Sequence, residues 1–136
     1  MSVIFVDTSA WLALLNRKDQ YHRRANDCWR ALAAGKQKLM TSNLVLSETL
    51  TLVGRRVSYE FSADQAELLY GMSLLTVLRP GYEQEMAALM MMRKYADQGV
   101  SFADCVSFAL MKRGVIPAAF TFDRHFAMAG FQLVPE

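Results

Sequence analysis

The sequence has few of the residues that cross-link a chain or insert it into a membrane. Its two cysteines, Cys28 and Cys105, form no CxxC pair and have no histidine pair nearby, so we expect reduced, buried thiols and no zinc site. No apolar run approaches the roughly 20 residues that a membrane-spanning helix needs. The N-terminus has no basic segment and no small-residue cleavage site, and Asp7 interrupts its apolar run. These features predict a cytoplasmic protein with no membrane association.

The sequence also lacks a strong excess of one charge. Its 15 Lys and Arg residues against 13 Asp and Glu residues give a net charge of +2. Such a balance neither requires nor excludes a nucleic-acid partner, so any basic surface has to be local. With 53% hydrophobic and 21% charged residues, the composition is typical of a globular protein and not of a disordered one. The length suits a single domain, residues 1–136, with its own core.

Short apolar segments alternate with longer segments of helical periodicity. The predicted strands cover residues 3–6, 38–42, 74–78, 118–122 and, as an edge strand, 131–134. The predicted helices cover residues 10–15, 22–34, 44–57, 61–71 with Ser62 as its N-cap, 83–96 and 104–113. This alternation predicts an α/β fold with a central parallel sheet between two helical layers. Right-handed crossovers then place all the strand exits on one side.

Three aspartates stand at the ends of predicted strands or the starts of predicted helices. Asp7 follows the first strand, Asp104 opens the helix after Ser101, and Asp123 follows the strand at residues 118–122. Each could also be a helix cap: Asp7 precedes Thr8, Ser101 and Asp104 resemble a capping box, and Asp123 could cap a turn at residues 124–128. Taken one at a time, these aspartates do not establish a site.

Glu48 has a different position. It lies four residues after Leu44 and four before Leu52, so it interrupts an apolar stripe of the predicted helix. A carboxylate in a packed face costs several kcal/mol unless a partner compensates it. We therefore expect a buried arginine or, better, a cation near Glu48.

Together, Asp7, Glu48, Asp104 and Asp123 predict a metal site at the carboxyl edge of the sheet. Gathered carboxylates repel one another unless a divalent ion neutralises them, and oxygen ligands favour Mg²⁺ or Mn²⁺. Such an ion activates water and stabilises charge on a phosphodiester. Three hydroxyl residues stand next to these acids: Thr8, Ser9 and Thr121. They could orient water or donate hydrogen bonds to the acids, or they could simply be helix caps or strand residues.

These motifs, in this order, resemble the PIN-domain proteins, specifically the VapC toxin subunits. The resemblance rests on DTSAW at residues 7–11, Glu48, SFADC at 101–105 and TFDRHF at 121–126, and it extends over nearly the whole chain. It implies a three-layer α/β/α PIN-like fold and an endoribonuclease that needs Mg²⁺ or Mn²⁺. It also implies an RNA substrate, a homodimer and a small inhibitory antitoxin. The family's acidic positions correspond to Asp7, Glu48, Asp104 and, least securely, Asp123.

Two other kinds of function are compatible with an α/β domain, and a third lacks the residues it needs. A phosphorylated receiver module needs an acid after the third strand and a lysine after the last one, whereas here Arg79 and Pro80 end the third strand and no such lysine follows Phe131. A PIN scaffold that binds RNA or protein without cutting, and a PIN nuclease of RNA maturation, both stay open.

Several further residues have structural and functional interpretations. Met90–Met92 could form a partner groove, but we expect them in the core. Asp97 could support the acids, but a helix-end position is expected. His22 and His125 lack partners at metal-ligand spacing and are expected to be structural or on the surface. The candidate phosphate contacts, which could equally be solvated helix ends, are Arg23–Arg24, Arg55–Arg56 and Lys112–Arg113.

Overall fold

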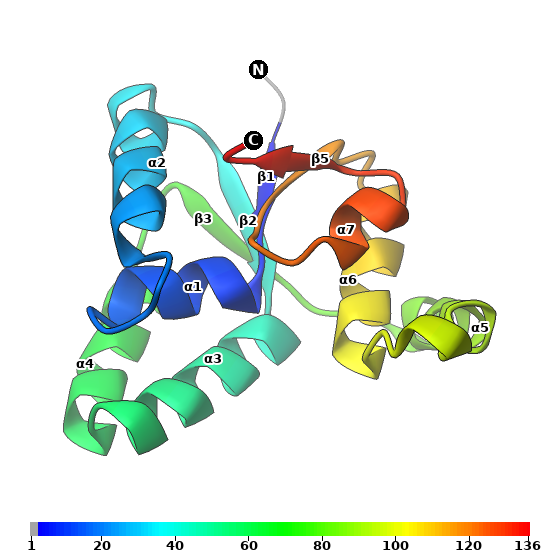
Figure 1. Ribbon diagram of the computed structural model, residues 1–136, viewed down its shortest axis with the longest axis horizontal. Coiled ribbons are helices and arrows are strands. Elements are labelled where there is room, and N and C mark those ends of the chain that lie inside the picture. Colours follow the sequence, from blue (N-terminus) through cyan, green and yellow to red (C-terminus); the bar gives the residue numbers. More distant parts are fainter. Residues whose placement is uncertain (1–2) are drawn as a thin grey trace.

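A five-stranded, fully parallel sheet forms the centre of the protein in a computed structural model that describes residues 3–136 (Figure 1). The elements in chain order are β1 (Ile4–Val6), α1 (Thr8–Leu15), α2 (His22–Ala34), β2 (Leu39–Ser42), α3 (Asn43–Arg56), α4 (Tyr59–Tyr70), β3 (Leu75–Leu78), α5 (Tyr82–Lys94), the 3₁₀ turn η1 (Ala96–Gln98), α6 (Phe102–Arg113), β4 (Ala118–Phe120), α7 (His125–Met128) and β5 (Gln132–Val134). All five predicted strands are confirmed.

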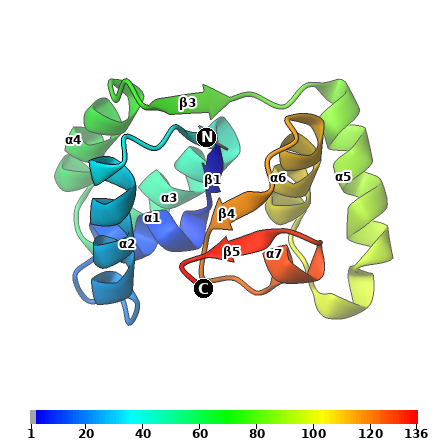
Figure 2. The ribbon, with the colours of Figure 1, turned by 90° about the horizontal axis from the view of Figure 1, so that it is seen from above.

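The strand order, β3-β2-β1-β4-β5, places β1 in the middle. Its register with β4 pairs Val6 with Phe120, so the residues that follow these two strands leave the sheet side by side. Helices α1 to α4 lie on one side of the strands and α5 to α7 on the other (Figure 2), which confirms the three-layer arrangement. In Figure 1, α1 and α3 begin at the lower ends of β1 and β2. This edge is the carboxyl edge of the sheet.

The core explains why these elements hold their places. Phe5 and Val6 of β1 are fully buried, and every residue from Cys105 to Met111 in α6 is buried, as expected for a helix between the sheet and α5. Phe108 packs edge-to-face on Phe126, with 4.9 Å between the ring centroids, and this contact anchors α7. The α6 start and the segment after β4 are therefore both attached to the core.

Two local predictions were wrong. The N-cap of α4 is Ser58, whose Oγ accepts a hydrogen bond from Phe61 N at 3.0 Å; Ser62 lies inside the helix, where its buried hydroxyl donates to Leu50 O at 2.6 Å. The methionines of α5 are not all in the core, because the side chains of Met90 and Met92 are 77% and 42% exposed. Helix α5 packs on α6 with its opposite face, which leaves these side chains without a covering layer.

The expectation of buried thiols holds for Cys105 and only in part for Cys28. Cys105 is buried, Cys28 is half-buried, and both are free thiols whose pKa burial raises. His22 is structural, with Nδ1 2.7 Å from Ala13 O. Among residues 3–136, no helix is long and apolar enough to span a membrane.

Candidate active site

The carboxyl edge of the sheet brings three of the predicted acids together. Asp7 follows β1, and Asp123 follows β4 by three residues. Asp104 lies in the first turn of α6, where its backbone N–H donates to the Ser101 hydroxyl at 3.1 Å. The Asp7 N–H donates to Phe120 O at 3.1 Å and so extends the ladder between β1 and β4. Three separate segments thus deliver carboxylates to one place.

A hydroxyl network holds the Asp7 carboxylate. Its Oδ2 accepts hydrogen bonds from Thr121 Oγ1 at 2.9 Å and from Ser9 Oγ at 3.2 Å, and it caps α1 through Ser9 N at 3.5 Å. Thr121 Oγ1 in turn accepts from Asp123 N at 3.0 Å, and Ser9 Oγ accepts from Phe122 N at 2.9 Å. Asp7 is therefore a helix cap whose charge also acts on Asp104, so the two interpretations of this residue are compatible.

The charges of the three acids act on one another. Burial raises the pKa of Asp7 to about 6 against the hydrogen bonds that lower it, and the Asp123 charge adds to the rise. Burial raises the pKa of Asp104 to about 8, with further contributions from the charges of Asp7 and Asp123. Negative charge is therefore held at this edge at an electrostatic cost, as expected of a site that a cation neutralises.

The donor atoms fit a divalent cation. Asp104, Asp123 and His125 each offer a ligand atom, and these atoms lie within 4.8 Å of one another. Two carboxylates and an imidazole are ordinary ligands for a first-row divalent ion. His125 was expected to have a structural or surface role, yet it lies in this cluster. The signal that could have revealed it is the Asp-x-His spacing that begins three residues after a buried strand.

Glu48 is placed differently from the prediction. Its side chain is exposed, and its Oε1 accepts a hydrogen bond from Thr8 Oγ1 at 2.9 Å. The core-facing residues of α3 include Val45, Leu46 and Val53, whereas Glu48 lines an open groove with Leu44 and Leu52. The stripe that Glu48 interrupts is thus not the buried face of α3, and the argument from a buried charge was wrong. Thr8 still links Glu48 to the residue next to Asp7.

The basic residues separate by position. Arg24 and Arg124 line a pocket with Thr121 and Phe122, the two residues that precede Asp123 in the chain. Arg24 lies 5.5 Å from the centroid of the Phe122 ring, which also stacks on Tyr21 at 4.5 Å. Arg55 lines the Glu48 groove, while Lys112 and Arg113 lie in the last turn of α6, at the far end of that helix. Asp97 is exposed on η1.

The fold and the acidic site together define a known class. The sequence matches the PIN domain family over residues 4–132, and the chain belongs to this family.

Individual relatives agree with this assignment. The chain is 37% identical to the 23S rRNA-specific endonuclease VapC20 of Mycobacterium tuberculosis, over 98% of this chain and 100% of that protein. A crystal structure of VapC20, described as a Sarcin-Ricin loop cleaving toxin, is similar with a TM-score of 0.83 and 36% identity, over 94% of this chain and 95% of that one. DNA-bound VapBC from Salmonella typhimurium shares the fold, with a TM-score of 0.69, 14% identity and coverage of 98% and 97%.

Proposed function

We propose that this protein is a divalent-metal-dependent endoribonuclease and the toxin of a VapBC-type toxin–antitoxin pair. The observation that carries the proposal is the meeting of Asp7, Asp104 and Asp123, from three segments, at an edge where burial and mutual repulsion raise the pKa of Asp7 and Asp104. A protein that only needed helix caps has no reason to place them together. The similarity to a 23S rRNA-specific endonuclease supports ribosomal RNA as the substrate class.

The acids have distinct tasks in the proposed reaction. Asp104 and Asp123 supply oxygen ligands for Mg²⁺ or Mn²⁺, and Asp7 joins them from the position that Thr121 and Ser9 hold. When bound, the ion neutralises the acids, activates water and stabilises charge on the phosphodiester. Glu48, exposed and oriented by Thr8, would accept a hydrogen bond from the attacking water. Hydrolysis leaves a 5′ phosphate and a 3′ hydroxyl.

The pocket of Arg24 and Arg124 supports a path for the RNA. Its lining includes Thr121, whose hydroxyl donates to Asp7, and guanidinium groups bind phosphates through paired N–H donors. The contact with Phe122 and a hydrogen bond of 3.3 Å to Glu136 O restrict the Arg24 side chain. We assign to Arg24 and Arg124 the contacts with a phosphate next to the scissile bond, where they offset the repulsion between RNA and the acids.

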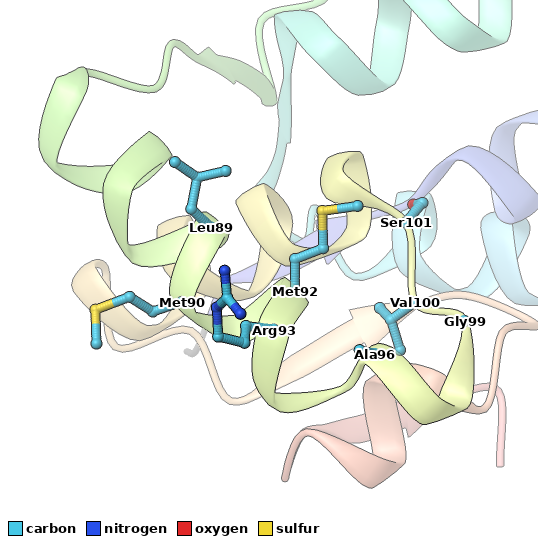
Figure 3. A pocket seen from close by; sticks show the side chains of 8 residues that line it. All are labelled: Leu89, Met90, Met92, Arg93, Ala96, Gly99, Val100 and Ser101. Atoms are coloured by element: carbon cyan, nitrogen blue, oxygen red, sulfur yellow. The ribbon is translucent and has the colours of Figure 1, made fainter.

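An exposed face of α5 supports the predicted homodimer. Leu89, Met90 and Met92 border a groove that ends at Val100 and Ser101, just before α6 (Figure 3). Along α5, Glu85 and Arg93 stand four residues before and after Leu89, and all three are exposed. A two-fold axis at Leu89 would pair Leu89 with its copy and Glu85 with Arg93 of the second chain. The face is thus complementary to itself in charge, and we assign it to a second copy of this chain.

An antitoxin is the second proposed protein partner. Cleavage of ribosomal RNA would harm the cell that makes the enzyme, so a cognate inhibitor is expected, as in the VapBC pairs. The soluble, cytoplasmic location predicted from the sequence suits such a complex.

One experiment tests the nuclease directly. Purified protein is incubated with 23S rRNA in EDTA, in Mg²⁺ and in Mn²⁺, and the ends of the products are sequenced. We expect cuts at defined positions that need the metal and that disappear in Asp104→Asn. Asp64→Asn, which removes an exposed acid of α4, is the matched control and should cut normally. Cutting in EDTA, or by Asp104→Asn at the wild-type rate, would contradict the proposal.

A further inference from the structure

The imidazole of His125 has a nitrogen that the fold leaves without a hydrogen bond. Its Nδ1 is buried and, among the described residues, has no partner with hydrogen-bond geometry, although it lies 3.0 Å from Asp123 Oδ1. A buried polar atom of this kind costs about 1–3 kcal/mol when it stays unsatisfied. The protein's only other histidine, His22, has its Nδ1 at hydrogen-bond distance from Ala13 O. A bound partner would satisfy the Nδ1 atom of His125, whereas the Nδ1 atom of His22 already has one within the protein.

The surroundings of this nitrogen point to a cation. Its neighbours are the carboxylates of Asp104 and Asp123, all within the 4.8 Å that encloses the candidate ligand atoms. Ligands at about 2.1 Å from an ion stand about 3.0 Å apart when they occupy adjacent octahedral positions. The observed separation of 3.0 Å between His125 Nδ1 and Asp123 Oδ1 matches this spacing.

From this geometry we infer that His125 is a nitrogen ligand of the active-site metal through Nδ1, beside Asp104 and Asp123. The inference rests on the proposed metal-dependent function and deepens it by adding a ligand other than the four acids.

Local structure holds the ring in place for this role. Asp123 Oδ1 accepts the backbone N–H of His125 at 2.9 Å, which closes a turn that begins three residues after β4. The next residue, Phe126, is fully buried against Phe108, so α7 is anchored immediately beyond the ring. The ring and the Asp123 carboxylate therefore reach the metal position as one unit, without a loop that has to reorganise on binding.

A nitrogen ligand changes which ion the site prefers. A neutral imidazole adds a ligand without adding negative charge to a place where three carboxylates already repel one another. Imidazole also favours transition-metal ions, whereas Mg²⁺ is best served by oxygen ligands alone. We expect Mn²⁺ to bind more tightly than Mg²⁺, and His125 to account for much of that difference.

Pulsed electron paramagnetic resonance of the Mn²⁺-loaded full-length protein tests the inference, because a directly bound imidazole gives a ¹⁴N coupling to the manganese. We expect this coupling in the wild type and its replacement by a ¹⁵N coupling when the protein is labelled with [¹⁵N]histidine. It should disappear in His125→Gln and persist in His22→Gln. In calorimetric titrations, His125→Gln should weaken Mn²⁺ binding by a factor on the order of 10 and Mg²⁺ binding by less.

The outcomes separate this inference from the proposed function. Mn²⁺ bound to the wild type without any histidine coupling would overturn the ligand role and leave the metal-dependent nuclease intact. A coupling that His22→Gln removes and His125→Gln keeps would have the same meaning. A wild type that binds neither Mn²⁺ nor Mg²⁺ would overturn both. The ¹⁴N coupling and the ¹⁵N coupling of the labelled protein are both measured on the wild type, so these two results do not depend on how the variants fold.

Discussion

Asp7→Asn offers a direct test of the electrostatics at the sheet edge, because it removes a charge and keeps the size of the side chain. Asp7 is 3% exposed and its pKa is raised from 3.8 to about 6. Each unit of such a shift corresponds to about 1.4 kcal/mol of free energy of unfolding. The ionised carboxylate therefore destabilises the metal-free fold by an amount on the order of 3 kcal/mol at pH 8. Asparagine is also a good N-cap and keeps an oxygen that can accept from Thr121 and Ser9.

The direction of the pH dependence follows from the raised pKa. A group that binds its proton more tightly in the folded state contributes stability that is complete below pH 3.8, the unfolded value. This contribution is lost as the pH rises through about 6. In EDTA, wild type and Asp7→Asn should thus be similar near pH 4, and Asp7→Asn should be more stable at pH 8. The upper limit of the difference is about 3 kcal/mol, because the two states relax around the charge.

Urea unfolding followed by circular dichroism at pH 4.5, 6 and 8 in EDTA measures this difference. Excess Mn²⁺ should remove most of this difference at pH 8, since an ion at a hundred times its dissociation constant adds about 2.7 kcal/mol to the protein that binds it. Asp7→Asn should also lose RNA cleavage. The exposed-site control, Asp64→Asn, should stay within about 0.5 kcal/mol of wild type at every pH. A metal-free Asp7→Asn protein that is less stable than wild type at pH 8 would refute the reasoning.

Three further variants test other parts of the site and surface. Thr121→Val removes a hydroxyl that donates to Asp7 and accepts the backbone N–H of Asp123. We therefore expect at least a tenfold loss in kcat and a loss of about 1–2 kcal/mol in the free energy of unfolding. An unchanged kcat would show that this hydroxyl does not position the site. Arg24→Ala should raise KM for RNA and should reduce the steepness of the plot of log affinity against log salt concentration by about 1. Arg30→Ala, which removes an equal charge elsewhere on α2, should change KM and this slope much less. Glu85→Arg should weaken self-association in sedimentation experiments, and adding Arg93→Glu should restore it; a double variant that stays monomeric would exclude the antiparallel α5 pairing.

The fold was predictable because its signals are local. A short, continuous apolar run such as Ile4–Val6 is typical of a strand buried in a sheet, and glycine or polar residues mark most helix ends. Where two cap candidates compete, the sequence is ambiguous. Ser58 and Ser62 both suit an N-cap, and the contact of the Ser62 hydroxyl with Leu50 O on α3 decides between them. That contact depends on how α3 and α4 pack, so no local sequence pattern predicts it.

The chemistry at the sheet edge was determined by sequence in part only. The sequence alone placed Asp7, Asp104 and Asp123 at strand exits or at a helix start, because chain order and parallel topology bring such positions to one edge. It could not decide which way a helix faces. The stripe with Glu48 looks into an open groove and the methionines of α5 reach the surface, because burial depends on which neighbours cover each face. Likewise, only the tertiary structure set His125 against two carboxylates, since the distance between α6 and the end of β4 is a property of the packed core.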